Sequence, residues 1–428
     1  MTTHKKNAFY AQSGGVTAVI NSTACGIIET AKKYGIKVYA GRNGIVGALT
    51  EDLIDTSKET IKDIAALRHT PGGAFGSCRY KLRCFKQDCS EYERLVQVFA
   101  AHNIGYFFYN GGGDSQDTAH KVSQMSQIMG YPLICIGIPK TMDNDLPFTD
   151  NCPGFGSVAK YIATSIRETG YDLASMAATS TKIFVMEVMG RHAGWTAAAA
   201  GMASESSSEA PHIILMPEIV FKETKFIGQV DACVKKHGNC AIVVSEGIRN
   251  SEDKFLHTTG YCDAFGNTQL GGTAPLIAKL IKHHLGYKYH WAVVDYLQRA
   301  ARHIASKTDV EQAYALGKAT VEFAHQGKNN VMMTIVRKSD KPYRWAIDCV
   351  ELEKVANVEK KMPRNFITAD GFHITNECRK YLAPLIHGED YPPFVNGLPQ
   401  YVRLKNLAVR KKLKKEFKLD RVVPTFSE

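Results

Sequence analysis

Residues 106–123 read YFFYNGGGDSQDTAHKVS, an apolar run followed by three glycines, an acid, a serine and a helix-like pattern. This order is typical of a strand in a parallel α/β sheet, in which ligands collect at the carboxyl ends of the strands. The glycines at 111–113 would let a ligand approach the backbone. Asp114 and Ser115 stand where the helix starts, so either could be its N-cap, and Asp114 could instead hold Mg²⁺ through carboxylate oxygen.

The same alternation of short apolar runs and amphipathic stretches covers most of the chain. It predicts strands at Ala8–Gln12, Lys37–Ala40, Gly105–Tyr109, Leu133–Ile138, Lys182–Val188, His212–Met216, Ala241–Ser245 and Val331–Arg337. The helical runs between them include Thr17–Tyr34, Glu91–Asn103 and Ser157–Met176. This rhythm favours an α/β protein with doubly wound, Rossmann-like domains.

The length of 428 residues suggests two or three domains. Pro and Gly interrupt the pattern near residues 145–155, and the α/β rhythm weakens after about residue 350. We therefore expect one α/β domain over 1–150, a second over 151–350 and a C-terminal extension over 351–428.

The positive charge is concentrated in residues 403–421, where nine Lys and Arg face two acids, a net +7 of the total +11. Leucines near helical spacing predict a basic amphipathic helix, so the extension is expected to be helical. Such a helix could bind nucleic acid or an anionic membrane. We favour docking by its apolar stripe, because no stacking motif accompanies it.

The composition is that of an ordinary globular protein, with 44% hydrophobic and 22% charged residues. No run of about 20 apolar residues is present, and the N-terminus lacks the apolar region of a secretory signal. The eleven cysteines form no CxxC pair and no cluster at zinc-ligand spacing. We expect a cytoplasmic protein with reduced thiols, bound neither to nucleic acid nor to a membrane.

Two further glycine-rich loops suggest anion binding. Ser13, Gly14 and Gly15 follow the first strand and precede a helix, where backbone N–H groups and the helix dipole attract phosphate. In PGGAFGSCRYKLR, residues 71–83, alternation puts Arg79, Lys81 and Arg83 on one side of an extended segment. Each loop alone also fits a structural reading, a tight turn or a solvated basic edge.

The most specific loop is GIPKTMDNDLP, residues 137–147, at the end of another strand. A turn explains one Asp or Asn, but not two carboxylates, a Thr and a Lys at one strand end. Asp143 could act as a general base on a hydroxyl, and Lys140 could neutralise a transferring phosphoryl group. Arg191 and Glu246 follow two further predicted strands, and Tyr296 and Arg299 come later in the chain. These polar and charged side chains could bind the substrate.

Taken in order, these loops resemble those of the phosphofructokinase family over roughly residues 6–340. PKTMDND and MEVMGRHAGW are similar to the pyrophosphate-dependent branch, because ATP-dependent members usually have Gly-Thr where this chain has Lys140-Thr141. The resemblance implies Mg²⁺-assisted, reversible transfer from pyrophosphate to the C1 hydroxyl of fructose 6-phosphate. It also implies a donor-binding first domain, a sugar-phosphate-binding second domain, and a homodimer or homotetramer.

Residue roles follow from the same resemblance. Asp143 is expected to be the general base, and Lys140, Asp114 and Arg79 are expected to act on the transferring phosphate. Mg²⁺ would be held by Asp114 and Asp145. The donor would be bound by Gly14, Gly15, Gly112, Gly113 and Ser115. The sugar phosphate would contact Thr141, Met142, Asp143, Met189, Gly190, Arg191, Glu246, Tyr296, Leu297, Gln298, Arg299 and Lys182.

Two positions depart from the family's pattern. Gly113 stands where ATP-dependent members have a metal-linked Asp, and Asp114 follows it; an acid at this second place would exclude the α-phosphate of ATP. Lys182 and His290 stand where members often have an Arg that reaches the 6-phosphate of a neighbouring subunit. Three alternatives remain open: an ATP-dependent kinase, the same chemistry on sedoheptulose 7-phosphate, and a sugar-phosphate-binding regulatory subunit.

Overall fold

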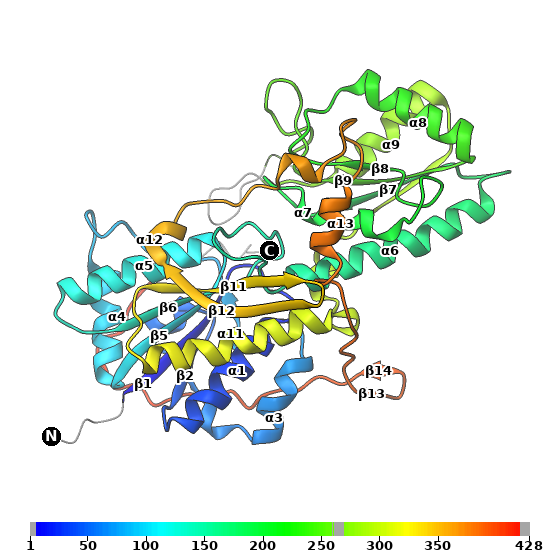
Figure 1. Ribbon diagram of the computed structural model, residues 1–428. Helices are drawn as coiled ribbons and strands as arrows, with labels where there is room; N and C mark the ends of the chain where they lie inside the picture. The colour runs from blue at the N-terminus through cyan, green and yellow to red at the C-terminus, as the bar shows by residue number, and fades with distance from the viewer. Residues whose placement is uncertain (1–5, 259, 261–268, 420–428) are drawn as a thin grey trace, which may run out of the picture.

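The computed structural model describes residues 6–258, 260 and 269–419, and two separate sheets form its framework (Figure 1). In the first sheet the strands follow the order β12 (Tyr343–Glu351), β11 (Val331–Asp340), β6 (Ile134–Pro139), β5 (Ile104–Gly111), β1 (Asn7–Ser13), β2 (Val38–Gly41) and β3 (Leu53–Asp55). The short β4 (Ser77–Cys78) also pairs with β1. The five inner strands are parallel, and only the edge strands β3 and β12 are antiparallel to their neighbours.

Both faces of the first sheet are covered by helices (Figure 1). Tyr10 and Phe108 belong to the core on the face of α1 (Ile20–Lys33) and α11 (Lys307–His325). Phe9 and Phe107 belong to the core on the face of α4 (Ser90–Ala101) and α5 (Gly113–Ile128). Successive residues of a strand point to opposite faces, so a continuous apolar run supplies both cores.

The second sheet is entirely parallel, in the order β10 (Tyr289–Val293), β7 (Ile183–Val188), β9 (Cys240–Ser245) and β8 (Ile213–Leu215). One face packs against α6 (Phe155–Met176) and α7 (Trp195–Ala199), and the other against α8 (Glu223–His237) and α9 (Thr273–Leu285). The shorter elements are α2 (Ile45–Leu49), α3 (Ile61–Ala66), α10 (Asp295–Ala300), α12 (Leu352–Val355), α13 (Asn376–Leu382) and the hairpin β13 (Phe394–Val395) and β14 (Leu398–Pro399). Across the described residues, no helix combines the length and apolar character needed to cross a bilayer.

All eight predicted strands are present, and the two doubly wound α/β units are confirmed. The expectation that residues 151–350 form one domain needs a correction. β11 and β12, at 331–351, join the first sheet next to β6. The chain thus leaves the first sheet after β6 and returns to it through α11, which packs on α1.

The prediction of a basic C-terminal helix is wrong. Residues 401–419 form an extended strap along the first domain, and Ala408 bridges Ile54 of the edge strand β3. The backbone of Asp55 donates to the Leu407 carbonyl at 2.9 Å, and Val409 donates to the Leu53 carbonyl at 2.7 Å. Six apolar side chains of the strap dock on the core, namely Val402, Leu404, Val409, Leu413, Phe417 and Leu419, whereas its basic side chains are exposed. The strap is extended because pairing with a sheet edge satisfies backbone groups that a helix would have satisfied internally.

Glu51 anchors the strap, and we expect Glu51→Ala to lower the free energy of unfolding by about 3 kcal/mol. Its carboxylate is 1% exposed, accepts the Lys412 backbone N–H at 2.6 Å and lies 2.8 Å from His102 Nε2. Burial opposes the charged form, but these contacts lower the pKa of Glu51 overall. The ionised Glu51 carboxylate therefore stabilises the folded state above its pKa in the unfolded chain, about 4.3. This stabilisation is lost as the pH falls through the lower pKa of the folded state.

Urea unfolding of the variant at neutral pH measures this effect. Glu416→Ala, which removes an exposed carboxylate of the same strap, serves as the matched control. Equal stability of the two variants would contradict the anchoring role of Glu51.

Candidate active site

One cavity of about 720 Å³ is lined by loops at the carboxyl ends of strands from both sheets. The loops after β1, β5 and β6 come from the first sheet, and those after β7 and β9 come from the second. The predicted residues that line it are Gly14, Gly15, Arg79, Gly112, Gly113, Asp114, Ser115, Lys140, Thr141, Met142, Asp143, Asp145, Met189, Arg191, Glu246, Tyr296 and Arg299. Tertiary folding therefore brings together loops spread over nearly 300 residues of sequence.

A cationic group lies beside the first glycine loop. Gly14 adopts a φ of +73°, a conformation that favours glycine, and the Lys140 ammonium donates to the Gly15 carbonyl. A Cβ at Gly15 would collide with the Arg299 guanidinium and would lie 3.5 Å from the Arg79 guanidinium. Burial, with Arg79 and Arg299 nearby, lowers the pKa of Lys140 to about 7. Three cations around a glycine turn form a strong anion site.

The loop after β5 has empty space beside Gly113, on the side that lines the cavity. A Cβ at Gly113 would meet no atom within 4 Å. Helix α5 begins at Gly113 with Gly112 as its N-cap and no side-chain cap, so the capping interpretation of Asp114 and Ser115 is wrong. Asp114 lies in the first turn of the helix, where the macrodipole favours an acid. Its carboxylate is half-exposed, 3.6 Å from Lys81 Nζ.

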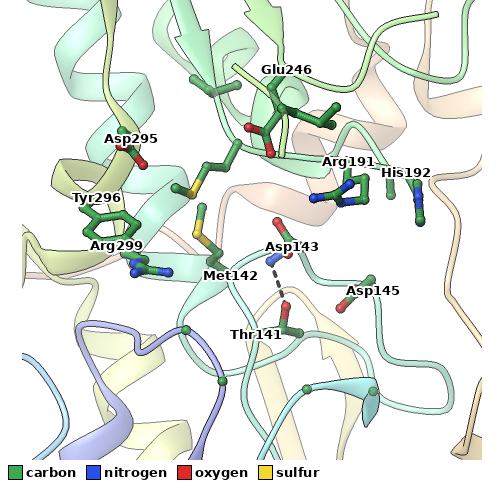
Figure 2. A pocket seen from close by; sticks show the side chains of 18 of the residues that line it. Thr141, Met142, Asp143, Asp145, Arg191, His192, Glu246, Asp295, Tyr296 and Arg299 are labelled. Carbon is green, nitrogen blue, oxygen red and sulfur yellow. Dashed lines mark hydrogen bonds between the residues drawn. The ribbon is translucent and has the colours of Figure 1, made fainter. Parts of the chain in front are cut away.

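Asp143 lies at the centre of the cavity (Figure 2). Its backbone N–H donates to Thr141 Oγ1 at 3.0 Å. Burial, together with the negative charges of Asp145 and Glu246, raises the pKa of Asp143 to about 7, against the opposing effects of Lys140 and Arg191. A carboxylate with a pKa near neutrality is suited to accept a proton from a hydroxyl.

Asp145 sits on the same loop, and its Oδ1 is buried without a hydrogen-bond partner. Burial raises the pKa of Asp145 despite an interaction with Thr141. An unpartnered buried carboxylate oxygen facing a cavity, together with the open space at Gly113 and the acid at Asp114, fits a hard divalent cation with oxygen ligands.

The second domain supplies the far wall. In Figure 2, Tyr296 and Arg299 lie on one side of Asp143, Arg191 and His192 lie on the other, and Glu246 faces it. The Arg299 guanidinium stacks over the Tyr296 ring at 3.7 Å from the ring centroid. Burial raises the pKa of Glu246 to about 6, although Arg191 favours its charged form.

Four predicted residues lie outside the lining. Gly190 donates its N–H toward the Glu246 carboxylate at 3.4 Å, and Gln298 accepts the Met189 N–H at 3.4 Å, so both support lining residues. Leu297 is exposed on α10. Lys182 precedes β7, at the opposite end of that strand, and donates to the Ala177 carbonyl at 2.7 Å, so it does not reach the cavity of its own chain.

The structure also adds lining residues that sequence reasoning missed. Glu187 and His192 stand inside the motif MEVMGRHAGW, which signalled a site without distinguishing them. Glu187 accepts the Ala274 N–H at 2.8 Å and so holds the start of α9. Glu359 comes from the C-terminal extension, pairs with His192 at 3.0 Å and has no sequence motif around it.

Outside the cavity, one group of His and Cys side chains among the described residues lies close enough together to be considered as a metal site. His212, Cys233 and Cys240 have ligand atoms within 4.8 Å of one another, near the amino ends of β8 and β9. The Ala241 N–H donates to His212 Nδ1 at 3.0 Å, and burial lowers the pKa of His212 to about 4. The neutral ring therefore carries its proton on Nε2, leaving no lone pair there for a metal. This group does not fit a metal centre.

Comparisons with known proteins identify the family of this chain. The phosphofructokinase family model matches residues 7–324. Two proteins named pyrophosphate–fructose 6-phosphate 1-phosphotransferase, from Methylococcus capsulatus and Halomonas elongata, are 65% and 62% identical, each covering 96% of this chain and 99% of its own. The crystal structure of a pyrophosphate-dependent phosphofructokinase from Marinobacter aquaeolei is 62% identical and covers 97% of this chain and 100% of its own, with a TM-score of 0.89. The chain therefore belongs to the phosphofructokinase family.

Proposed function

We propose that this chain transfers a phosphoryl group reversibly from pyrophosphate to the C1 hydroxyl of fructose 6-phosphate, giving fructose 1,6-bisphosphate and phosphate, a step of glycolysis. The main support for this function is the set of residues that line the cavity. The cavity places Asp143, a carboxylate with a pKa near neutrality, next to a group of three cations at a glycine turn. The full-length similarity to enzymes with this name supports the same activity.

In this mechanism Asp143 takes the proton of the C1 hydroxyl as that oxygen attacks the terminal phosphorus of pyrophosphate. The bond to the bridging oxygen breaks, and phosphate leaves. Lys140 and Arg79 lie where they can offset the charge on the transferring group, and the glycine loops hold the donor through backbone N–H groups. In the reverse direction, protonated Asp143 returns the proton to the sugar oxygen.

The second domain binds the sugar phosphate in this proposal. Glu246 accepts hydrogen bonds from sugar hydroxyls, and the loop Met189-Gly190-Arg191 holds the sugar next to Asp143. Arg299, stacked on Tyr296, lies close to Gly15 as well, so it can pair with phosphate at the boundary between the donor and sugar sides. Arg299 as the 6-phosphate clamp and a contact from Lys182 of a neighbouring subunit remain predictions.

The proposed cofactor is Mg²⁺, which Asp114 and Asp145 would hold. When bound, it neutralises the charge of the phosphates and orients them for in-line transfer. Lys81, which pairs with Asp114 in the structure, then competes with the cation for the same carboxylate.

We also propose a homodimer or homotetramer in the cytoplasm. β10 is an edge strand of the second sheet, and its Trp291 and Val293 are 47% and 39% exposed. An edge strand with exposed apolar side chains is typical of an interface with another chain. Tyr296 and Leu297, which follow it, are exposed as well, so such an interface would border the cavity.

Comparing initial rates with pyrophosphate and with ATP tests the donor. We expect turnover with fructose 6-phosphate and pyrophosphate, and turnover at least about 100-fold lower with ATP. The reason is that the side chain and charge of Asp114, which lines the cavity beside Gly113, would exclude the α-phosphate of ATP. Asp114→Gly should gain ATP-dependent turnover if Asp114 is only a gate, and should lose Mg²⁺ dependence if it is also a metal ligand.

Equal wild-type rates with both donors would overturn the pyrophosphate assignment and support the ATP-dependent alternative. A higher kcat/KM for sedoheptulose 7-phosphate would change the acceptor but keep the chemistry. Binding of sugar phosphate without turnover of either donor would support a regulatory subunit.

A further inference from the structure

The backbone between the two cavity carboxylates is held in a left-handed conformation. Asn144 has a φ of +54° and is fully buried between Asp143 and Asp145. This conformation is uncommon for residues other than glycine, and Asn is among those that tolerate it. It needs support from its surroundings, because the directions of Asp143 and Asp145 depend on it.

That support comes largely from the C-terminal extension. The Asn144 side chain accepts the Cys152 N–H at 3.0 Å and the Lys360 ammonium at 3.3 Å, and it donates to the Tyr381 hydroxyl at 2.9 Å. The Tyr381 hydroxyl in turn donates to the Asp150 carbonyl at 2.7 Å. Lys360 and Tyr381 both lie beyond residue 324, where the match to the family model ends.

Lys360 makes the larger set of contacts. Besides Asn144, its ammonium donates to the carbonyls of Thr149 and Asp150 at 3.2 and 3.0 Å, so each of its three N–H groups has an acceptor. Its backbone N–H donates to the Asp145 carbonyl at 2.6 Å. The ammonium also lies 5.3 Å from the centroid of the Trp195 ring in α7.

The charge of Lys360 bears on the site as well. Burial lowers the pKa of Lys360, and the carboxylates of Asp150 and Asp145 oppose that shift. Conversely, Lys360 favours the charged form of Asp145.

We propose that Lys360 is a positioning residue for the reaction: acting through Asn144 and Asp145, it fixes the loop that carries the general base, with Tyr381 as its partner. The segment around Lys360 then contributes to catalysis by positioning the loop, although it lies outside residues 7–324, which match the family model. This inference rests on the proposed function, because the base that it positions is Asp143.

The test compares Lys360→Met, which keeps the side-chain length and removes the charge, with Lys361→Met, its exposed neighbour, in the full-length protein. We expect Lys360→Met to lower kcat about 10- to 100-fold with KM for fructose 6-phosphate within about threefold, because a shift of about 1 Å in a reacting group has effects of this size. Lys361→Met should match wild type.

Tyr381→Phe provides a second measurement that removes only one hydroxyl, so it decides the question if Lys360→Met does not fold. It should lower kcat about 3- to 10-fold at a thermal midpoint close to wild type, and Lys360→Arg should restore part of the activity lost in Lys360→Met. Folded Lys360→Met or Tyr381→Phe with wild-type kcat would overturn the proposal. Failure of wild type to use pyrophosphate would instead overturn the proposed function.

Discussion

Asp143→Asn is expected to lower kcat by about 10²- to 10⁴-fold, the range in which a general base contributes. The amide is isosteric with the carboxylate but cannot accept the hydroxyl proton. The buried position and the nearby charges of Asp145 and Glu246, which raise the pKa of Asp143 to about 7, make it the carboxyl best suited to that task. Steady-state rates in both directions should fall together, because the same group serves both.

The pH dependence gives a second check on this residue. The base must be unprotonated in the forward reaction, so wild-type kcat/KM should rise as the pH increases through about 7. Asp143→Asn should lose this rising limb. Asp172→Asn, which changes an exposed carboxylate of α6, is the control. Turnover of Asp143→Asn within a few fold of wild type would contradict the assignment.

Lys140→Met is expected to have the second-largest effect, a fall in kcat of about 10²- to 10³-fold, as for loss of one preorganised charge in a buried site. Lys140 is 4% exposed, donates to the Gly15 carbonyl and lines the donor side of the cavity. Its removal leaves less positive charge where the transferring phosphoryl group develops negative charge.

This variant should also change the pH profile in a defined way. Lys140 must be protonated to act, and its pKa is about 7, so wild-type activity should fall as the pH rises above that value. Lys140→Met should lose this falling limb. Its rising limb should move to higher pH, because Asp143 loses a cation that lowers its pKa. Lys279→Met, an exposed change on α9, serves as the control, and an unchanged profile in Lys140→Met would remove Lys140 from the mechanism.

The glycine and aspartate loops were predictable because each is local. A buried strand, a glycine turn and a helix start appear consecutively in sequence, and parallel α/β topology sends every such loop to the same edge of a sheet. The sequence therefore predicted that Gly14, Lys140 and Asp143 follow strands of one parallel sheet and lie at the same edge of it. The family resemblance added their roles.

What the sequence did not reveal depends on contacts between distant segments. Residues 403–419 carry a helix-like spacing of leucines, but the edge of β3 offers an extended backbone partner and Glu51 accepts the strap's N–H groups. β11 and β12 return to the first sheet because their apolar faces complete its cores. Neither outcome is encoded in a local pattern.

The sequence by itself thus determined the fold class, the strands and the chemical groups of the cavity, since periodicity and turn chemistry act over a few residues. Only the tertiary structure decided which contacts those groups make, that Lys182 does not reach the cavity of its own chain, that Glu359 lines the cavity, and that Lys360 contacts the loop that carries the general base. The physical reason is that burial, hydrogen bonding and charge coupling depend on distance in space. The pKa of Asp143 depends on neighbours as far away in sequence as Glu246, and that of Lys140 depends on Arg299.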